Sequence, residues 1–108
     1  MKRGEIWLLT VPGIDQLRPV LVISNDHANA DARYRPTALD IHTPRVSGDF
    51  GMYLVELAER DPMTGHLVDA TTVTNYTRTR FVGTPLGIVT GASLVKIDGA
   101  LKTWLDIP

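Results

Sequence analysis

Residues 18–26 read Arg-Pro-Val-Leu-Val-Ile-Ser-Asn-Asp, and this stretch predicts a buried strand over residues 20–23 that ends in a polar turn. Pro19 fixes its own φ and disfavours the α region for the residue before it, so Arg18 is held extended where the strand begins. A guanidinium fixed in this way can grip two phosphate oxygens. The alternative is a solvated charge that merely ends a strand. Arg18 is therefore the first candidate for a phosphate-binding residue.

The composition indicates one folded domain over residues 1–108, with a single hydrophobic core. Hydrophobic residues make up 44% of the chain, which is ordinary for a globular protein and argues against disorder. The formal net charge is −1, so the chain has no global basic field, and any nucleic-acid site must be a local patch. Cysteine is absent, which excludes disulfides, thiol catalysis and thiolate metal sites.

The start of the chain has two features of a secretory leader, because Lys2 and Arg3 precede an apolar stretch over residues 6–11. However, Glu5 interrupts the pattern, the stretch is too short, and no small-residue cleavage site follows it. No segment reaches the apolar length that a bilayer requires. We therefore expect a cytoplasmic protein that has no membrane partner.

Short segments rich in β-branched and apolar residues alternate with turn residues along most of the chain. They predict strands over residues 6–11, 17–24, 37–43, 52–57, 66–76 and 81–89, and one helical turn within residues 25–33. Helical spacing then relates Leu94, Ile97, Leu101, Trp104 and Leu105, with Thr90 or Ser93 as the N-cap. This order predicts a mainly β fold, a small, partly open β-barrel with a C-terminal helix packed on it.

The chain opens with Met1-Lys-Arg-Gly-Glu-Ile-Trp-Leu-Leu9, and a short loop separates this stretch from the run over residues 18–26. Together the two stretches strongly resemble the MazF/PemK family, small bacterial endoribonucleases of toxin–antitoxin pairs. The resemblance implies an SH3-like barrel of the CcdB/PemK type and a homodimer. It is weaker over residues 44–86, where Thr71-Thr72-Val73-Thr74-Asn75 stands in place of an acidic and basic pair. The loop over residues 12–17 is also shorter than is usual in the family.

The resemblance implies that two residues act on the scissile phosphate. Arg18 matches the family's catalytic arginine, and Thr43 matches a family threonine whose hydroxyl can hydrogen-bond the phosphate. Cleavage without a metal also needs a base for the 2′-hydroxyl and an acid for the leaving 5′-oxygen. Strand alternation directs His42 to the face opposite Thr43, which favours a surface histidine. Three residues remain candidates for proton transfer: Asp15, His42 and Asp69.

Several basic residues are expected to follow the RNA backbone: Lys2, Arg3, Arg33, Arg35 and Arg45. Tyr34 lies between two of these arginines and can stack an unpaired base, as aromatic rings do in proteins that bind single strands. The alternative for residues 33–35 is a solvated loop before a strand. The three histidines lack metal-ligand spacing, so we expect neither a metal nor any other cofactor.

The favoured function is the toxin of a type II toxin–antitoxin system, a metal-independent endoribonuclease that cleaves single-stranded RNA to a 2′,3′-cyclic phosphate and a 5′-hydroxyl. Its expected partners are single-stranded RNA, a cognate antitoxin and a second copy of the chain. One alternative is a CcdB-like poison that traps DNA gyrase without hydrolysis, which the threonine-rich segment over residues 71–75 favours. Another is an inactive homologue that binds RNA or antitoxin. The run over residues 18–26 favours the nuclease.

Overall fold

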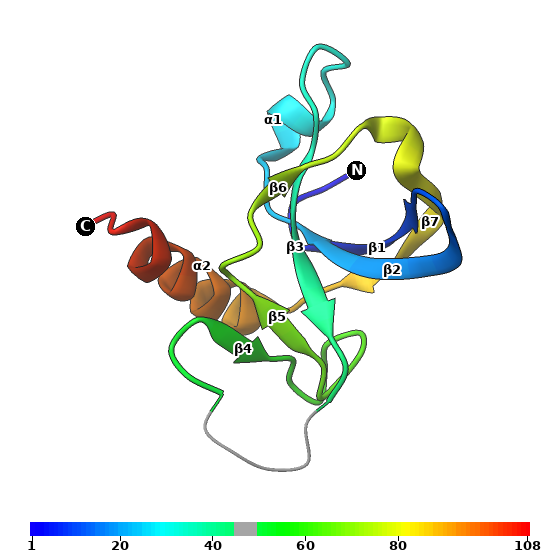
Figure 1. Ribbon diagram of the computed structural model, residues 1–108. Coiled ribbons are helices and arrows are strands. Elements are labelled where there is room, and N and C mark those ends of the chain that lie inside the picture. Colours follow the sequence, from blue (N-terminus) through cyan, green and yellow to red (C-terminus); the bar gives the residue numbers. More distant parts are fainter. Residues whose placement is uncertain (45–49) are drawn as a thin grey trace.

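The computed structural model describes residues 1–44 and 50–108. Its elements in chain order are β1 (Glu5–Val11), β2 (Ile14–Val22), α1 (Asp26–Asn29), β3 (Thr37–His42), β4 (Leu54–Glu56), β5 (Leu67–Asp69), β6 (Thr74–Asn75), η1 (Arg78–Arg80), β7 (Phe81–Ile88) and α2 (Gly91–Leu105). The strands pair antiparallel in the order β4-β5-β3-β2-β1-β7, and β6 also pairs with β3 (Figure 1). No helix among the described residues is long and apolar enough to span a membrane.

The sheet is open, because β4 and β7 end the strand order without pairing with each other. The helix α2 is the last element in the chain order, and it packs against β4 (Figure 1). The predicted fold class, mainly β and partly open with a C-terminal helix, is confirmed. The helix begins where the sequence predicted, since the Thr90 side chain accepts a hydrogen bond from the backbone N–H of Ser93 as the N-cap.

The hairpin of β1 and β2 is tighter than predicted. Its turn consists of Pro12 and Gly13, and β2 already begins at Ile14. Gly13 has a positive φ of 77°, which suits a residue without a side chain. The prediction of a loop over residues 12–17 was wrong, because exposed polar residues in this part of β2 hide the strand pattern. Arg18 therefore lies within β2, opposite Leu9, rather than at the start of the strand.

The single strand predicted over residues 66–76 was also wrong, because two short strands replace it. β5 pairs with the end of β3 and β6 pairs with its beginning. Between them the Asp69 carboxylate accepts hydrogen bonds from the backbone N–H and the hydroxyl of Thr71, at 2.9 and 2.6 Å. A side chain that bonds its own backbone two residues on makes a turn. This local bond overrides the strand preference of the β-branched residues that follow.

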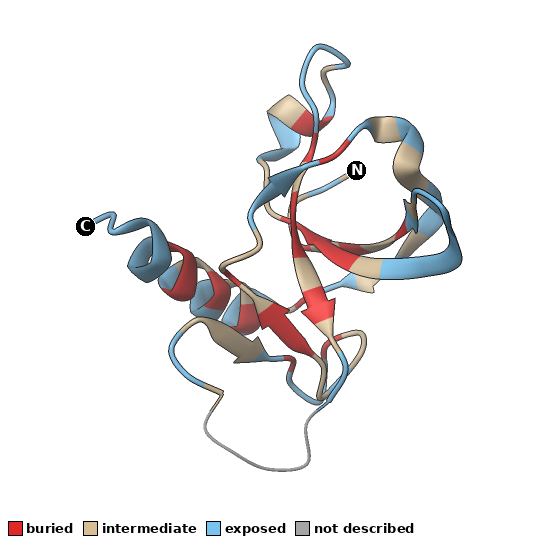
Figure 2. Cartoon of the chain, viewed as in Figure 1, coloured by how far each residue is buried: buried red, intermediate tan, exposed pale blue. Residues whose placement is uncertain are grey.

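The main core lies between the sheet and α2, and Figure 2 shows buried residues on the facing sides of both. Its fully buried members include Ile6 of β1, Leu21 of β2, Leu39 of β3 and Ile97 of α2. A second, smaller cluster centres on Leu9, Val20, Ala38 and Tyr76. Burying a large aliphatic side chain contributes about 1.5–3 kcal/mol. The two clusters use opposite faces of β1, β2 and β3, so all three strands are fixed from both sides.

A buried carboxylate joins the segment before β5 to the start of α2. Asp61 is 6% exposed, and it accepts hydrogen bonds from the backbone N–H groups of Thr90 and Ala58, both at 2.7 Å, and from the Ser93 hydroxyl. Burial raises the pKa of Asp61, but the bonds from Ser93, Thr90 and Ala58 outweigh burial and hold the pKa below its ordinary value. The ionised form is therefore the one that the fold stabilises.

We expect Asp61→Asn to lower the free energy of unfolding at neutral pH by about 1–3 kcal/mol, because an amide nitrogen would face a buried donor. A folded-state pKa below the unfolded value of roughly 3.9 gives stability that is complete above that pH. This stability is lost as pH falls through the folded pKa. Chemical denaturation at a series of pH values should therefore show the deficit of Asp61→Asn shrinking in acid. Asp15→Asn, at an exposed carboxylate on β2, is the control. A deficit that does not change with pH would contradict the assignment.

Candidate functional site

A pocket of about 560 Å³ lies where the outer end of β3 meets β2 and the segment before β5. Seven residues line it: Arg18, Pro19, Ile41, His42, Thr43, Met63 and His66. Three of the residues that the sequence analysis singled out thus line one site, although Arg18 is far along the chain from His42 and Thr43. Proline, isoleucine and methionine are the apolar residues of the lining, and an arginine, two histidines and a threonine are its polar residues.

The pairing of β2 with β3 explains why Arg18 and His42 meet. Val20 lies opposite Asp40, and continuing this antiparallel register by two residues brings Arg18 opposite His42. Met63 and His66 come from the segment that leads into β5, whose Leu67 lies opposite His42 on the other side of β3. The pocket is therefore built around the last residue of β3.

Arg18 is oriented by an acidic neighbour. Its Nη2 atom lies 3.2 Å from Oδ1 of Asp40, and the arginine side chain remains 48% exposed. Asp40 is itself held, because its backbone N–H donates to the Thr72 hydroxyl at 2.8 Å and the Tyr76 hydroxyl donates to Oδ1 at 3.4 Å. Exposed ion pairs contribute little stability, so the pair serves mainly to direct the guanidinium. The arrangement leaves a half-exposed cation that an anion in the pocket can reach.

His42 is bound to Asp69, with 2.9 Å between Nε2 and Oδ2. Burial raises the pKa of Asp69, but hydrogen bonds from Thr71 and His42 outweigh burial and hold the pKa below its ordinary value. An ionised carboxylate only accepts hydrogen bonds, so Nε2 of His42 carries the hydrogen. The atom that remains for proton exchange with a ligand is therefore Nδ1.

Both faces of β3 border the pocket, because Ile41, His42 and Thr43 all line it. The prediction that His42 and Thr43 point to opposite faces stays a prediction. His42 is also only partly exposed, at 39% of its side chain, and it is not a free surface histidine. Asp69, which the sequence analysis considered for proton transfer, contacts the pocket through His42 and does not line it.

His66 is the residue that the sequence analysis missed. Its Nδ1 atom lies 3.1 Å from the backbone oxygen of Met63, and both residues line the pocket. No motif or spacing in the sequence indicated it. The only available signal was the Asp-Pro-Met-Thr-Gly turn over residues 61–65, which places the next residue at the start of a strand.

The other candidates lie away from this pocket. Asp15 is exposed on β2 near the hairpin turn. Arg3 is engaged, because its Nε donates to the backbone oxygen of Ile23 at 2.9 Å and its guanidinium pairs with Asp98 of α2. Lys2 is exposed on the segment before β1.

The expected base-stacking group lies in the loop between α1 and β3, at the opposite end of β3 from the pocket (Figure 1). Tyr34 is 55% exposed, and the Arg33 guanidinium lies 5.8 Å from its ring centre. Arg33 also pairs with Asp31 at 2.7 Å, and Arg35 is exposed. Arg45 lies outside the described residues. The described members of the expected basic set thus do not gather around Arg18.

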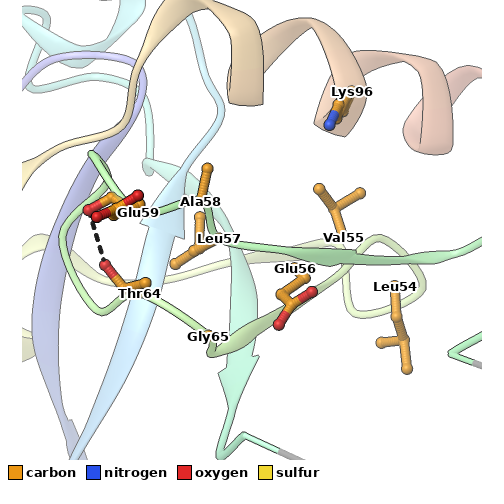
Figure 3. A pocket seen from close by; sticks show the side chains of 9 residues that line it. All are labelled: Leu54, Val55, Glu56, Leu57, Ala58, Glu59, Thr64, Gly65 and Lys96. Atoms are coloured by element: carbon orange, nitrogen blue, oxygen red, sulfur yellow. Dashed lines mark hydrogen bonds between the residues drawn. The ribbon is translucent and has the colours of Figure 1, made fainter. Parts of the chain in front are cut away.

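A second pocket, of about 490 Å³, lies between β4, the segment that follows it and α2 (Figure 3). Its charged residues are Glu56, Glu59 and Lys96, and it contains no residue predicted from the sequence. Two carboxylates disfavour a polyanion there. Among the described residues, no group of three or more histidine, cysteine, aspartate or glutamate side chains is placed to hold a metal ion. The first pocket is therefore the stronger candidate for phosphate chemistry.

Comparisons with known proteins agree on the kind of protein, although no family model matches the chain. Endoribonuclease MazF9 of Mycobacterium tuberculosis is 31% identical over 115 residues, which cover 99% of this chain and 98% of that protein. An endoribonuclease in complex with its cognate antitoxin, from a mycobacterial species, has a similar structure. Its TM-score is 0.83 at 28% identity, and the match covers 100% of this chain and 97% of that one. A MazE–MazF complex from Deinococcus radiodurans shares the fold, with a TM-score of 0.78, 19% identity and 100% and 97% coverage.

Proposed function

The chain belongs to the MazF family of endoribonuclease toxins, and from this premise we propose that it cleaves single-stranded RNA as the toxin of a type II toxin–antitoxin pair. One observation carries the proposal: Arg18, Thr43 and His42 line a single pocket, with Asp69 bound to the histidine. A cation, a hydroxyl and an imidazole are the groups that phosphodiester cleavage without a metal requires.

In the proposed mechanism the 2′-hydroxyl of the RNA attacks its own 3′-phosphate. The bond from phosphorus to the 2′-oxygen forms and the bond to the 5′-oxygen breaks, giving a 2′,3′-cyclic phosphate and a 5′-hydroxyl. Arg18 stabilises the negative charge of the pentavalent phosphate, and the Thr43 hydroxyl donates a hydrogen bond that orients it. His42 is the proton-transfer residue of the three candidates, because Asp69 orients it in the pocket and Asp15 lies elsewhere.

Two further proposals concern where and with what the protein acts. Its RNA substrate is in the cytoplasm, so we propose that the protein acts there. The similar mycobacterial endoribonuclease has a cognate antitoxin, which supports an antitoxin partner for this chain. An acidic antitoxin segment would be drawn to the same cations as the RNA, and the two should then compete.

We test the enzymatic proposal by incubating the purified protein with a long unstructured RNA in EDTA and by mapping the ends. Arg18→Ala should slow cleavage about 10²–10³-fold, because the charge on the pentavalent phosphate loses its partner. Arg18→Lys should restore little activity, since an ammonium group cannot make a bidentate contact with the phosphate. Lys102→Ala, an exposed cation on α2, controls for the loss of one positive charge. Wild-type cleavage by a folded Arg18→Ala would remove this residue from the site. A wild-type protein that cuts no RNA would favour the gyrase poison or the inactive homologue.

Thr43→Val should slow the same reaction by about 10–100-fold, because a hydrogen bond to a charged group contributes roughly 1.5–3 kcal/mol. Valine keeps the shape and the β-branching of threonine and removes only the hydroxyl. Thr79→Val, at an exposed threonine of η1, is the matched control and should cleave at the wild-type rate. Normal cleavage by Thr43→Val would show that this hydroxyl does not contact the phosphate.

We also propose a homodimer, because exposed apolar side chains lie along the edge strand β7 and near the end of α2. They include Val82, Leu86, Ile88, Trp104 and Leu105. Two-fold pairing would cover such side chains and double the arginines along one RNA-binding channel. Light scattering at micromolar concentration should give twice the chain mass of 11.9 kDa. A monomeric mass together with full ribonuclease activity would exclude a dimeric groove.

A further inference from the structure

We propose that His66 is a second proton-transfer residue of this pocket, so that two histidines divide the two proton transfers of RNA cleavage. The inference rests on the proposed endoribonuclease function and adds a residue and a division of roles to it. It starts from the position of His66, which lines the same pocket as Arg18, Thr43 and His42. His66 enters from the segment before β5, whereas His42 ends β3. The two histidines therefore enter the pocket that Arg18 lines from different elements.

The hydrogen bonds of His66 determine which of its nitrogens is available. Nδ1 lies 3.1 Å from the backbone oxygen of Met63, and a carbonyl oxygen only accepts hydrogen bonds. Nδ1 therefore carries the hydrogen, and in the neutral ring Nε2 presents a lone pair. That lone pair is the group that a general base needs in order to take the proton of the 2′-hydroxyl.

The turn that carries His66 is firmly held, so the ring has a fixed position. The Met63 oxygen accepts a second bond from the backbone N–H of His66 at 3.0 Å, and the His66 oxygen accepts one from the backbone N–H of Leu57 at 2.9 Å. Asp61 ties the same turn to α2. On another side Pro62 packs so close to Gly87 that a Cβ at Gly87 would lie 2.5 Å from the proline Cγ. A proton-transfer group must be positioned in this way to act on a bound substrate.

In His42 the two ring nitrogens have exchanged roles relative to His66. Its Nε2–H donates to Asp69, which leaves Nδ1 as the nitrogen for proton transfer. Of the two histidines, His42 has the carboxylate that can balance the positive charge of a protonated ring. We therefore assign His66 as the base and His42 as the acid. The 2′-hydroxyl proton passes to Nε2 of His66, and the leaving 5′-oxygen takes a proton from Nδ1 of His42. Exchange with solvent then returns both rings to their starting states.

The charged and titratable groups around His66 come from every element that borders the pocket. Arg18, which pairs with Asp40 of β3, comes from β2, and His42 comes from β3. Asp69 of β5 contacts the far side of His42, and Asp61 of the same turn is directed to α2. A base and an acid of this kind give a bell-shaped dependence of kcat/KM on pH.

The test uses the full chain and an RNA oligonucleotide that contains a single mapped cleavage site. His66→Asn keeps a donor for the Met63 oxygen, in the place of Nδ1, but lacks Nε2. His42→Gln keeps a donor for Asp69, in the place of Nε2, but lacks Nδ1. Each variant should slow cleavage by about 10²–10⁴-fold with little change in KM. His66→Asn should lose the acidic limb of the pH profile, and His42→Gln should lose the alkaline limb. His27→Gln, at an exposed histidine of α1, is the control for both.

A second substrate separates the two roles. When a bridging sulfur replaces the leaving 5′-oxygen, the departing thiolate needs no proton. His42→Gln should then recover most of the wild-type rate, whereas His66→Asn should remain slow. Wild-type rate and an intact acidic limb in His66→Asn would overturn the inference while leaving the endoribonuclease function in place, because the wild-type protein still cleaves. If His66→Asn does not fold, His66→Gln is measured in the same way, with circular dichroism as the check.

Discussion

β3 is bonded to other strands along both of its sides, and the rest of the structure depends on this double pairing. It pairs with β2 on one side, and with β5 and β6 on the other. A shift of register by one residue would turn every side chain of the strand to the other face. The pairing of Val20 with Asp40 and of His42 with Leu67 therefore decides which residues meet at the end of β3. The candidate site exists only in this register.

Three carboxylates around that strand hold the side chains or the turn of the candidate site in place. Asp40 directs Arg18, Asp69 directs His42, and Asp61 holds the turn that presents His66. Each accepts more than one hydrogen bond, so each is held at a defined position rather than acting as a loose surface charge. In a chain of net charge −1, which has no global basic field, this local arrangement is what we propose receives the phosphate.

Local rules were sufficient for much of the fold and for part of the site. Short segments rich in β-branched and apolar residues predicted β3, β7 and the buried part of β2, and helical spacing behind Thr90 predicted α2. Arg18 could be singled out because Pro19 restricts it through the adjacent peptide bond, which is an effect of neighbouring residues. The same rules failed where a side chain bonded the backbone, as at Asp69, because such a bond competes with strand pairing and leaves no periodic pattern.

The sequence by itself determined the class of fold and the family, and it singled out Arg18 and Thr43 as candidates, because these follow from short-range pattern and from motifs. Only the tertiary structure decided that His42 binds Asp69 across 27 positions and that His66 lines the same pocket. It also decided that Arg3 binds Asp98 of α2 rather than facing that pocket. Contacts of this kind depend on strand register and on the packing of distant segments. Neither can be read from a single sequence, because a hydrogen bond leaves no mark on the spacing of the residues that make it.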